Sequence, residues 1–318
     1  MILLIGSGMM AVEYASVLKK LGKKFRVVGR SEKSCLEFFK KTNHEAISGG
    51  LEEFIRHDNT EVYDSAIVAV NVEQLFSTTK LLIEKGISNI LVEKPAALSI
   101  NDINLLNELA EKYSSNVFIA YNRRFYASVL AAKSIITNDG GVTSFTFDIT
   151  ERSYLIEKIV QDKLVKSRWF LANSTHVVDL AFYLCGKPTD INCITGGEGV
   201  LPWHRNASLF YGSGRTKNNI LFSYSGDWSA PGRWSLEVMT KNSRLIFSPM
   251  EKLKIQKIGS MAIEDINLED ELDTKFKPGL YHQTKSFIQK DFDGFCTLSD
   301  HLETFKIYLD MAGYSHDD

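Results

Sequence analysis

A glycine-rich turn near the start of the chain constrains its fold more than any other feature. The turn follows the apolar run Ile2–Ile5 and precedes the helix-like run Val12–Leu21. It fits the G-x-G-x-x-G/A pattern, in which the first glycine allows a tight turn, the second lets a pyrophosphate approach the backbone, and the last residue permits close helix packing. The sequence therefore predicts a Rossmann domain whose first helix holds the cofactor phosphates at its amino terminus. The expected cofactor contacts in this turn are Gly6, Ser7, Gly8, Met9, Met10 and Ala11.

The residues after the second expected strand bear on the identity of the cofactor. NAD enzymes usually carry an acidic residue there to bind the adenosine ribose, but this chain has Arg30 and Ser31. These two side chains favour a 2′-phosphate, so we expect NADP in preference to NAD. Arg30 could instead stack on the adenine or face solvent. Val70 and Asn71, at the end of a later strand, are also expected to contact the cofactor.

The tripeptide Glu93-Lys94-Pro95 directly follows the apolar strand expected over Asn89–Val92. Ligands of open parallel sheets bind beyond the carboxyl ends of the strands, so Lys94 is delivered to the cleft, and Pro95 keeps it extended. An amine there can exchange the proton of a hydroxyl while a hydride leaves the carbon. Alternatively, Lys94 pairs with Glu93 or with a cofactor phosphate. Glu93 itself is expected to shape the turn or to touch the cofactor, and the Lys-Pro bond is either cis or trans.

Two domains are expected in a chain of 318 residues. Up to about residue 120, short apolar runs alternate with amphipathic segments, which predicts an α/β Rossmann domain over residues 1–121. After residue 140 the pattern becomes that of an α+β domain with a mostly antiparallel sheet, placed at residues 122–318. The last helices, expected at Tyr281–Gln289 and Asp300–Met311, could pack back on the first domain. The strands expected in the second domain are Val142–Ile149, Ile191–Thr195, Ala207–Tyr211, Ile220–Tyr224, Trp234–Met239 and Arg244–Phe247.

Composition excludes several classes of protein. Hydrophobic residues make up 44% and charged residues 24%, close to soluble averages, and the formal charge is −2 with Lys and Arg scattered along the chain. We therefore expect no nucleic-acid partner. The four cysteines lack metal-binding or redox spacing, so we expect reduced thiols and no metal site. No basic leader and no run of about 20 apolar residues is present, so we expect a cytoplasmic protein without membrane contact.

Four segments together resemble the Gfo/Idh/MocA oxidoreductase family. They are GSGMMA at residues 6–11, EKP at 93–95, YNRRF at 121–125 and THVVDLAFYLCG at 175–186. The resemblance extends over essentially the whole chain, and EKP is its most specific element. It implies a Rossmann domain followed by a domain with a large open sheet, and NAD(P)-linked redox chemistry mostly on sugars and cyclitols. Because an open sheet usually needs covering, we expect a homodimer or homotetramer formed through the second-domain sheet.

The resemblance also implies catalytic roles. Lys94 matches the family's active-site lysine, and His176 matches its active-site histidine. Many members carry an aspartate four residues before this histidine, but this chain has Ala172 there. Asn173 would project near His176 if the helix extends that far, and could orient the substrate without acting as a base. Asp179 could hydrogen-bond the imidazole or be structural. Lys94 is therefore expected to carry more of the proton transfer.

Other candidate substrate contacts lie near these residues. The family places substrate or cofactor contacts in the YNRRF segment, and Asn122 and Arg123 are the candidates for reaching the cleft. If both Arg123 and Arg124 entered the pocket, the substrate would carry a phosphate or carboxylate, because guanidinium groups bind such oxyanions bidentately. Trp169, which follows Arg168, could form an aromatic wall for a sugar.

These features predict an NAD(P)-dependent dehydrogenase or reductase acting on CH–OH groups. It would transfer a hydride between nicotinamide and a carbon of a sugar, amino sugar or nucleotide sugar. One alternative is glycoside cleavage assisted by bound NAD without net redox. Another is a regulator that senses the dinucleotide without catalysis, and the retention of Lys94 and His176 counts against it.

Overall fold

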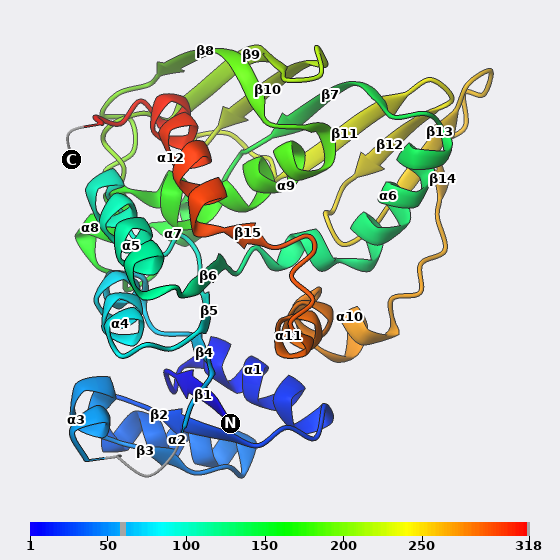
Figure 1. The fold of residues 1–318 in the computed structure, drawn as a ribbon. Coiled ribbons are helices and arrows are strands. Elements are labelled where there is room, and N and C mark those ends of the chain that lie inside the picture. Colours follow the sequence, from blue (N-terminus) through cyan, green and yellow to red (C-terminus); the bar gives the residue numbers. More distant parts are fainter. Residues whose placement is uncertain (58–61, 317–318) are drawn as a thin grey trace. The chain divides into compact units, whose positions relative to one another are not determined.

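The computed structural model describes residues 1–57 and 62–316, which form two compact units. The first unit comprises Met1–Asn122 and Leu272–Glu303, and the second comprises Arg123–Glu271 and, among the described residues, 304–316. After building most of the second unit, the chain therefore returns to the first and then contributes its last helix mainly to the second. Figure 1 shows the elements of both units along the chain.

The sheet of the first unit has the strand order of dinucleotide-binding proteins. Its strands run β3-β2-β1-β4-β5-β6-β15, all parallel except the pairing of β15 with β6. Strands β1, β4 and β5 are buried along their whole length, as expected for a parallel sheet covered on both faces. The expected Rossmann domain is thus confirmed. The strands are β1 (Ile2–Ile5), β2 (Phe25–Val28), β3 (Ala46–Ile47), β4 (Ser65–Val68), β5 (Asn89–Val92), β6 (Asn116–Ile119) and β15 (Cys296–Thr297).

Two helices of this unit begin after a serine whose hydroxyl caps the first turn, and one begins without a side-chain cap. The Ser99 hydroxyl accepts a hydrogen bond from the Asp102 N–H at 3.1 Å, and the Ser31 hydroxyl accepts one from Ser34 at 3.3 Å. The helix that follows the glycine-rich turn has no such side-chain cap. The helices are α1 (Met9–Lys20), α2 (Glu32–Thr42), α3 (Gly50–His57), α4 (Val72–Glu84), α5 (Ile100–Tyr113), α10 (Glu271–Lys275) and α11 (Leu280–Gln289).

The returning segment is joined to the Rossmann sheet by aromatic packing as well as by β15. The ring of Phe118 on β6 lies 4.4 Å from that of Phe292 and 5.3 Å from that of Phe295, measured between ring centroids. Phe287 of α11 meets the same ring edge-on at 6.4 Å. Packing between aromatic rings stabilises a fold beyond the effect of their buried area. The returning segment is therefore held in place over an edge of the sheet that would otherwise be open.

The second unit contains an eight-stranded sheet with the order β14-β13-β12-β11-β7-β10-β9-β8. Only β7 and β10 pair in parallel, so the expected, mostly antiparallel sheet is confirmed. The edge strands β13 and β14 were not expected, because their polar sequences lack the apolar alternation on which the prediction relied. The strands are β7 (Val142–Asp148), β8 (Pro188–Gly196), β9 (Leu209–Thr216), β10 (Leu221–Asp227), β11 (Ser235–Thr240), β12 (Ser243–Phe247), β13 (Lys254–Lys257) and β14 (Glu264–Asp265).

One face of this sheet is apolar and covered. Phe145 of β7 stacks on Phe222 of β10 at 5.0 Å, and Phe182 meets both rings edge-on at 6.4 and 5.5 Å. Phe182 belongs to α9, so this helix covers the middle of the sheet. The helices assigned mainly to this unit are α6 (Ala127–Asn138), α7 (Ser153–Ile156), α8 (Lys163–Ser167), a π-helical turn (Phe170–Ser174), α9 (Thr175–Cys185) and α12 (Leu298–Ala312), which starts in the first unit.

A buried histidine links the loop before β9 to the end of the chain. His204 is fully buried, and its Nδ1 lies 2.7 Å from the carbonyl oxygen of Ala207, which can only accept a hydrogen bond. Nδ1 therefore carries the proton, and Nε2 accepts from the Tyr314 hydroxyl at 2.6 Å. Burial lowers the pKa of His204. The neutral ring thus serves as donor and acceptor at once.

We predict that His204 makes the fold sensitive to mild acid. Its pKa is lower in the folded state than in the unfolded chain, so its contribution is fully present above about pH 6.5 and is lost as the pH falls toward the folded pKa. The melting temperature should therefore fall more between about pH 7.5 and about pH 5.5 in the unmodified protein than in His204→Gln, which cannot titrate there. His57→Gln, at an exposed position, is the control. Equal losses in the unmodified protein and His204→Gln would contradict the prediction.

Candidate active site

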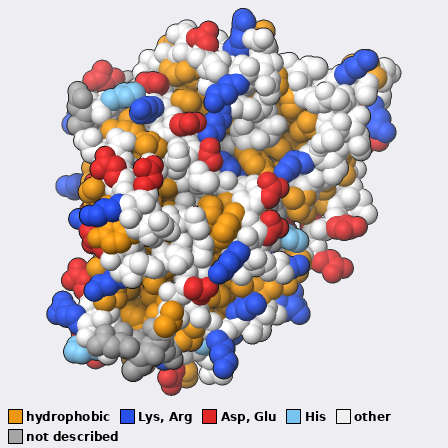
Figure 2. Space-filling model, in the orientation of Figure 1, with side chains coloured by type: hydrophobic (Ala, Val, Ile, Leu, Met, Phe, Trp, Pro, Cys, Tyr) orange, Lys and Arg blue, Asp and Glu red, His pale blue; other side chains and the backbone are white. Residues whose placement is uncertain are grey.

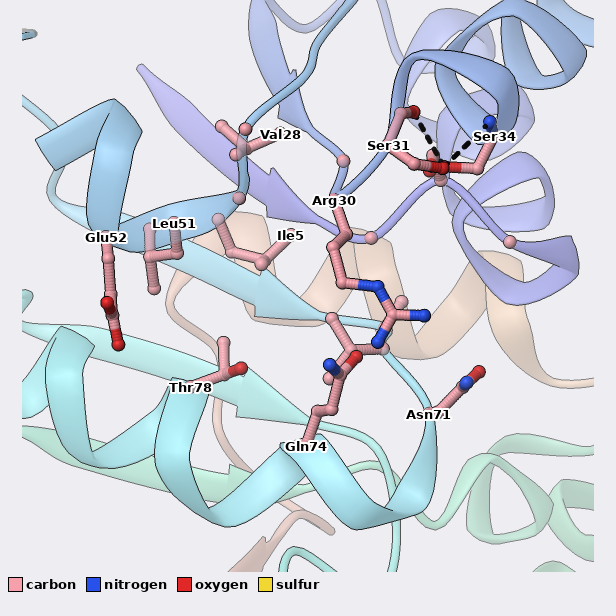
Figure 3. A pocket seen from close by; sticks show the side chains of 18 of the residues that line it. Ile5, Val28, Arg30, Ser31, Ser34, Leu51, Glu52, Asn71, Gln74 and Thr78 are labelled. Carbon is pink, nitrogen blue, oxygen red and sulfur yellow. Dashed lines mark hydrogen bonds between the residues drawn. The ribbon is translucent and has the colours of Figure 1, made fainter. Parts of the chain in front are cut away.

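A pocket of about 400 Å³ lies at the carboxyl ends of β1, β2 and β4 in the first unit. Side chains from the turns after these strands and from α4 line it, as Figure 3 shows. Arg30 extends from the end of β2 into the pocket toward Gln74 and Asn71, and Glu52 and Thr78 lie at its other end. Sequence reasoning did not single out the α3 and α4 residues, which carry no pattern of their own.

The two glycines of the fingerprint turn have different structural roles. Gly6 has φ +119°, and a Cβ built there would lie 2.3 Å from the Ala69 carbonyl oxygen, so only glycine fits. A Cβ on Gly8 would have no heavy atom within 4 Å, so the space beside it is open. Helix α1 begins at the next residue without a side-chain cap, which leaves its first N–H groups pointing toward this space. The turn fits a dinucleotide pyrophosphate.

The predicted cofactor contacts divide into two groups in the structure. Seven of them line the pocket: Gly6, Ser7, Gly8, Arg30, Ser31, Val70 and Asn71. The others serve elsewhere in this unit. Ala11 is fully buried where α1 meets the sheet, and the side chain of Met9 is 75% exposed. Met10 continues the first turn of α1, and Glu93 and Lys94 lie in the turn after β5.

Three hydroxyl groups gather beside Arg30 at the start of α2. The Ser7 hydroxyl donates to Ser34 at 2.9 Å, and the Ser31 and Ser34 hydroxyls lie 3.0 Å apart. Ser34 was not predicted, although its position three residues after a capping serine is a recognisable signal. Gly29 permits this arrangement, because a Cβ there would lie 2.6 Å from Ser7 Oγ. Together with Arg30, these hydroxyls form a polar, positively charged corner of the pocket.

The turn containing Lys94 is held from the side of α1. Tyr14 is fully buried, and its hydroxyl donates to Glu93 Oε1 at 2.9 Å. Burial raises the pKa of the Glu93 carboxyl, while the charge of Lys94 and the Tyr14 hydrogen bond lower it. Burial of Tyr14 and, as a smaller cause, the charge of Glu93 raise the pKa of Tyr14 well above its ordinary value. The charge of Lys94 thus acts on the neighbouring Glu93 carboxyl.

The turn is also held from the returning segment. His301 on α12 is fully buried, and its Nε2 donates to the Pro95 carbonyl oxygen at 3.0 Å. The bond between Lys94 and Pro95 is cis, and the Ala96 N–H closes the turn on the Glu93 carbonyl at 3.1 Å. Ala96 has φ +65°, an uncommon conformation for a residue with a side chain. His301 was given no role from the sequence, because a contact across 206 positions leaves no local pattern.

In the second unit, His176 lies in a group of aromatic and charged side chains. It is buried in the first turn of α9, and its ring lies 6.3 Å from that of Trp234. The guanidinium of Arg123 stands over the same indole at 4.9 Å, and Arg233 approaches it at 5.9 Å. Burial lowers the pKa of Arg123. The structure thus brings His176 and Arg123 together around the indole of Trp234.

The second arginine of the YNRRF segment is engaged elsewhere. Arg124 Nε and Nη2 donate to the two carboxylate oxygens of Asp179 at 2.8 and 2.6 Å. The pair is bidentate and almost wholly buried, so Asp179 has a structural partner. Asn122 donates its amide to the Pro278 carbonyl at 2.9 Å within the first unit.

The residues just before α9 form a π-helical turn, Phe170–Ser174. Asn173 Nδ2 and Ser174 Oγ donate to Glu151 Oε1 at 2.9 and 2.7 Å. Trp169, directly before this turn, meets the ring of Trp203 edge-on at 6.0 Å. Glu151 was not among the sequence candidates, because a single glutamate after a strand has no distinguishing pattern.

Comparisons with known proteins agree with this architecture. Residues 1–121 match the model of an oxidoreductase family with an NAD-binding Rossmann fold, GFO_IDH_MocA. No curated protein matches the chain at a significant level. No helix among residues 1–57 and 62–316 has the length and apolar character needed to cross a membrane.

Solved structures resemble the chain over nearly its whole length. Levoglucosan dehydrogenase in complex with NADH has a TM-score of 0.80 at 15% identity, covering 98% of this chain and 95% of that one. An oxidoreductase from Desulfitobacterium hafniense, described as NADPH-dependent, has 0.78 at 15%, covering 99% and 95%. UDP-N-acetylglucosamine 3-dehydrogenase from Acidithiobacillus ferrooxidans has 0.74 at 12%, covering 99% and 97%. The family match thus covers the Rossmann unit, residues 1–121, and the solved structures show that the fold of the whole chain is of the same kind.

The two fingerprint glycines give a matched pair of variants. Gly6→Ala forces a Cβ against the Ala69 carbonyl at a positive φ, so it should lower the free energy of unfolding by about 2 kcal/mol or more. Gly8 has φ −84°, which alanine adopts easily, and its Cβ would meet only open space. Gly8→Ala should therefore melt like the unmodified protein but bind NADPH about tenfold or more weakly. Unchanged NADPH binding by Gly8→Ala would refute the placement of the pyrophosphate.

Proposed function

We propose that the protein is an NADP-preferring oxidoreductase that moves a hydride between nicotinamide and a ring carbon of a sugar, amino sugar or nucleotide sugar. The observation that carries this proposal is the fixed turn of Lys94 at the end of β5, in the same Rossmann unit as the pocket. Structural relatives support the substrate class, since two of them act on levoglucosan and on UDP-N-acetylglucosamine.

Lys94 would handle the proton of the reacting hydroxyl. The bound dinucleotide, held by the Gly6–Gly8 turn and the start of α1, would accept or supply the hydride. Lys94 Nζ would take the hydroxyl proton during oxidation and return it during reduction. Two hydrogen bonds, from Tyr14 to the Glu93 carboxylate and from His301 to the Pro95 carbonyl oxygen, hold the residues on both sides of the lysine. This preorganisation reduces the cost of positioning the amine during the reaction.

The second unit would bind the substrate through His176 and buried donor groups of the same unit. Among the residues that the structure describes, Arg123 Nε, Trp169 Nε1 and Trp234 Nε1 are buried and have no hydrogen-bond partner. All three can only donate, so they suit a ligand rich in acceptor oxygens. Sugar hydroxyls and ring oxygens have this chemistry. Arg123 and Trp169 therefore remain our candidates for substrate contact, together with His176 and Asn173; Asn122, engaged with Pro278, is a weaker candidate.

The preference for NADP rests on the corner formed by Arg30 and three serine hydroxyls. A 2′-phosphate needs positive charge and hydrogen-bond donors, and Arg30, Ser31 and Ser34 offer both. Figure 3 shows that the Arg30 side chain points into the pocket, which favours this role over a solvent-facing one. Glu52 lies at the opposite end of the pocket in the same view, away from this corner.

A homodimer or homotetramer would cover the second face of the β7–β14 sheet. Exposed apolar side chains occur on three neighbouring strands there, with Ile194 60%, Tyr211 45% and Leu221 57% exposed. Ser223 and Thr146 hydroxyls on the same sheet hydrogen-bond at 3.1 Å, so the surface mixes polar and apolar groups. On the face visible in Figure 2, acidic and basic side chains are interspersed, which does not favour a polyanionic partner.

We predict that Lys94→Met abolishes most of the turnover. The substitution keeps the length of the side chain but removes the proton-exchanging amine, so kcat should fall by about a hundredfold or more. Binding of NADPH, followed by fluorescence, should change by less than about threefold, since phosphates are held elsewhere. Lys85→Met, at an exposed position after α4, is the control. Full turnover by Lys94→Met would contradict the proposed role of Lys94 in proton transfer.

A second prediction concerns cofactor choice. The unmodified protein should bind NADPH more tightly than NADH, and Arg30→Asp should weaken NADPH binding by about tenfold or more while affecting NADH little. Lys24→Asp makes the same charge reversal just before the first residue of β2, whereas Arg30 follows the last one. This control should leave the preference for NADPH unchanged. Fluorescence titration with both nucleotides measures the effect. Tighter binding of NADH by the unmodified protein would defeat the assignment.

A further inference from the structure

Glu151 is a buried carboxylate near the start of α9. It lies three residues after the end of β7, and its side chain is 7% exposed. The preceding residues are anchored, because Trp228 Nε1 donates to the Ile149 carbonyl at 2.9 Å and the Asp227 N–H donates to Thr150 Oγ1 at 3.1 Å. Glu151 is therefore held by a rigid segment. A carboxylate buried in this way is costly unless donors surround it.

Two donors meet Glu151 from the segment that leads to His176. Asn173 Nδ2 and Ser174 Oγ both donate to Oε1, at 2.9 and 2.7 Å. These residues precede His176 by three and two positions. The hydrogen bond also settles the orientation of the Asn173 amide, because Nδ2 faces the carboxylate and Oδ1 becomes the end that can accept from a ligand hydroxyl.

Glu151 brings an acid to a segment that has none of its own. The π-helical turn Phe170–Ser174 contains no acidic residue, and Ala172 within it is buried and 4% exposed. Through Asn173 and Ser174, Glu151 places a carboxylate against this turn, which leads directly into His176. The charge of Glu151 also acts on Arg123, whose guanidinium shares the Trp234 ring with His176. The carboxylate thus belongs to the same cluster, although it comes from a different element.

We propose that Glu151 supplies the negative charge missing at Ala172 and acts as a positioning residue for Asn173 and His176. The proposal rests on the proposed function, in which His176 and Asn173 contact the substrate. Glu151 orients the Asn173 amide and favours the protonated form of the His176 ring. Other charged groups around the cluster are Arg233, Glu251 and the Arg124–Asp179 pair.

The test compares Glu151→Gln with Glu157→Gln. Glutamine keeps an acceptor oxygen for Asn173 and Ser174 but removes the charge, whereas Glu157 is exposed and serves as a matched control. We expect Glu151→Gln to melt and to bind NADPH like the unmodified protein. With a sugar that the unmodified protein oxidises, the kcat/KM of Glu151→Gln should be lower by about tenfold or more, mainly through kcat. Wild-type kcat/KM in Glu151→Gln would overturn the catalytic part of the proposal.

A second measurement does not require turnover. In ¹³C-labelled protein, the NMR titration midpoint of His176 should move to lower pH in Glu151→Gln, because the lost carboxylate no longer favours the imidazolium. The control variant Glu157→Gln should leave the His176 midpoint in place. If no sugar is oxidised by the unmodified protein, the proposed function fails, but this titration still decides the role of Glu151. An unchanged His176 midpoint would overturn it. Should Glu151→Gln fail to fold, Glu151→Asp, which keeps the charge, must preserve the midpoint.

Discussion

The parallel register of β1, β4 and β5 is the constraint on which the first unit depends. Ile5 is paired with Val68, and Val68 with Val92, so the three strands end at the same level. The ladder continues one residue further, where the Ala69 N–H donates to Ile5 and the Glu93 N–H donates to Val68 at 2.7 and 3.0 Å. This register brings the fingerprint turn and the lysine turn to one edge of the sheet.

The same register explains why position 6 must be glycine. Gly6 follows Ile5 directly, and the neighbouring strand places the Ala69 carbonyl where any Cβ would lie. The lysine turn is held in addition by side chains from α1 and α12. Close backbone packing therefore shapes the first turn, and side-chain hydrogen bonds hold the second.

Sequence patterns predicted the parts of the site that depend on local order. The strand, turn and helix around Gly6 are contiguous, and so are β5 and its lysine, which made both recognisable. Tyr14, His301 and Glu151 could not be found in this way, because each acts on a residue 22 to 206 positions distant. Hydrophobic periodicity shows which face of a helix is buried but not which polar group it meets there. The roles of Asp179 and Arg124 stayed open for the same reason.

Buried charge in the second unit follows a consistent logic. Asp179 and Arg124 neutralise each other through two hydrogen bonds, so neither has net charge to offer a ligand. The charge of Glu151 acts on Arg123, and each of the two groups has a different neighbour: an indole for the guanidinium, and an amide and a hydroxyl for the carboxylate. Charges that are separated in this way continue to act on neighbouring groups. A carboxylate anchored beside β7 also keeps its place if the π-helical turn adjusts, whereas an aspartate at position 172 would move with the turn.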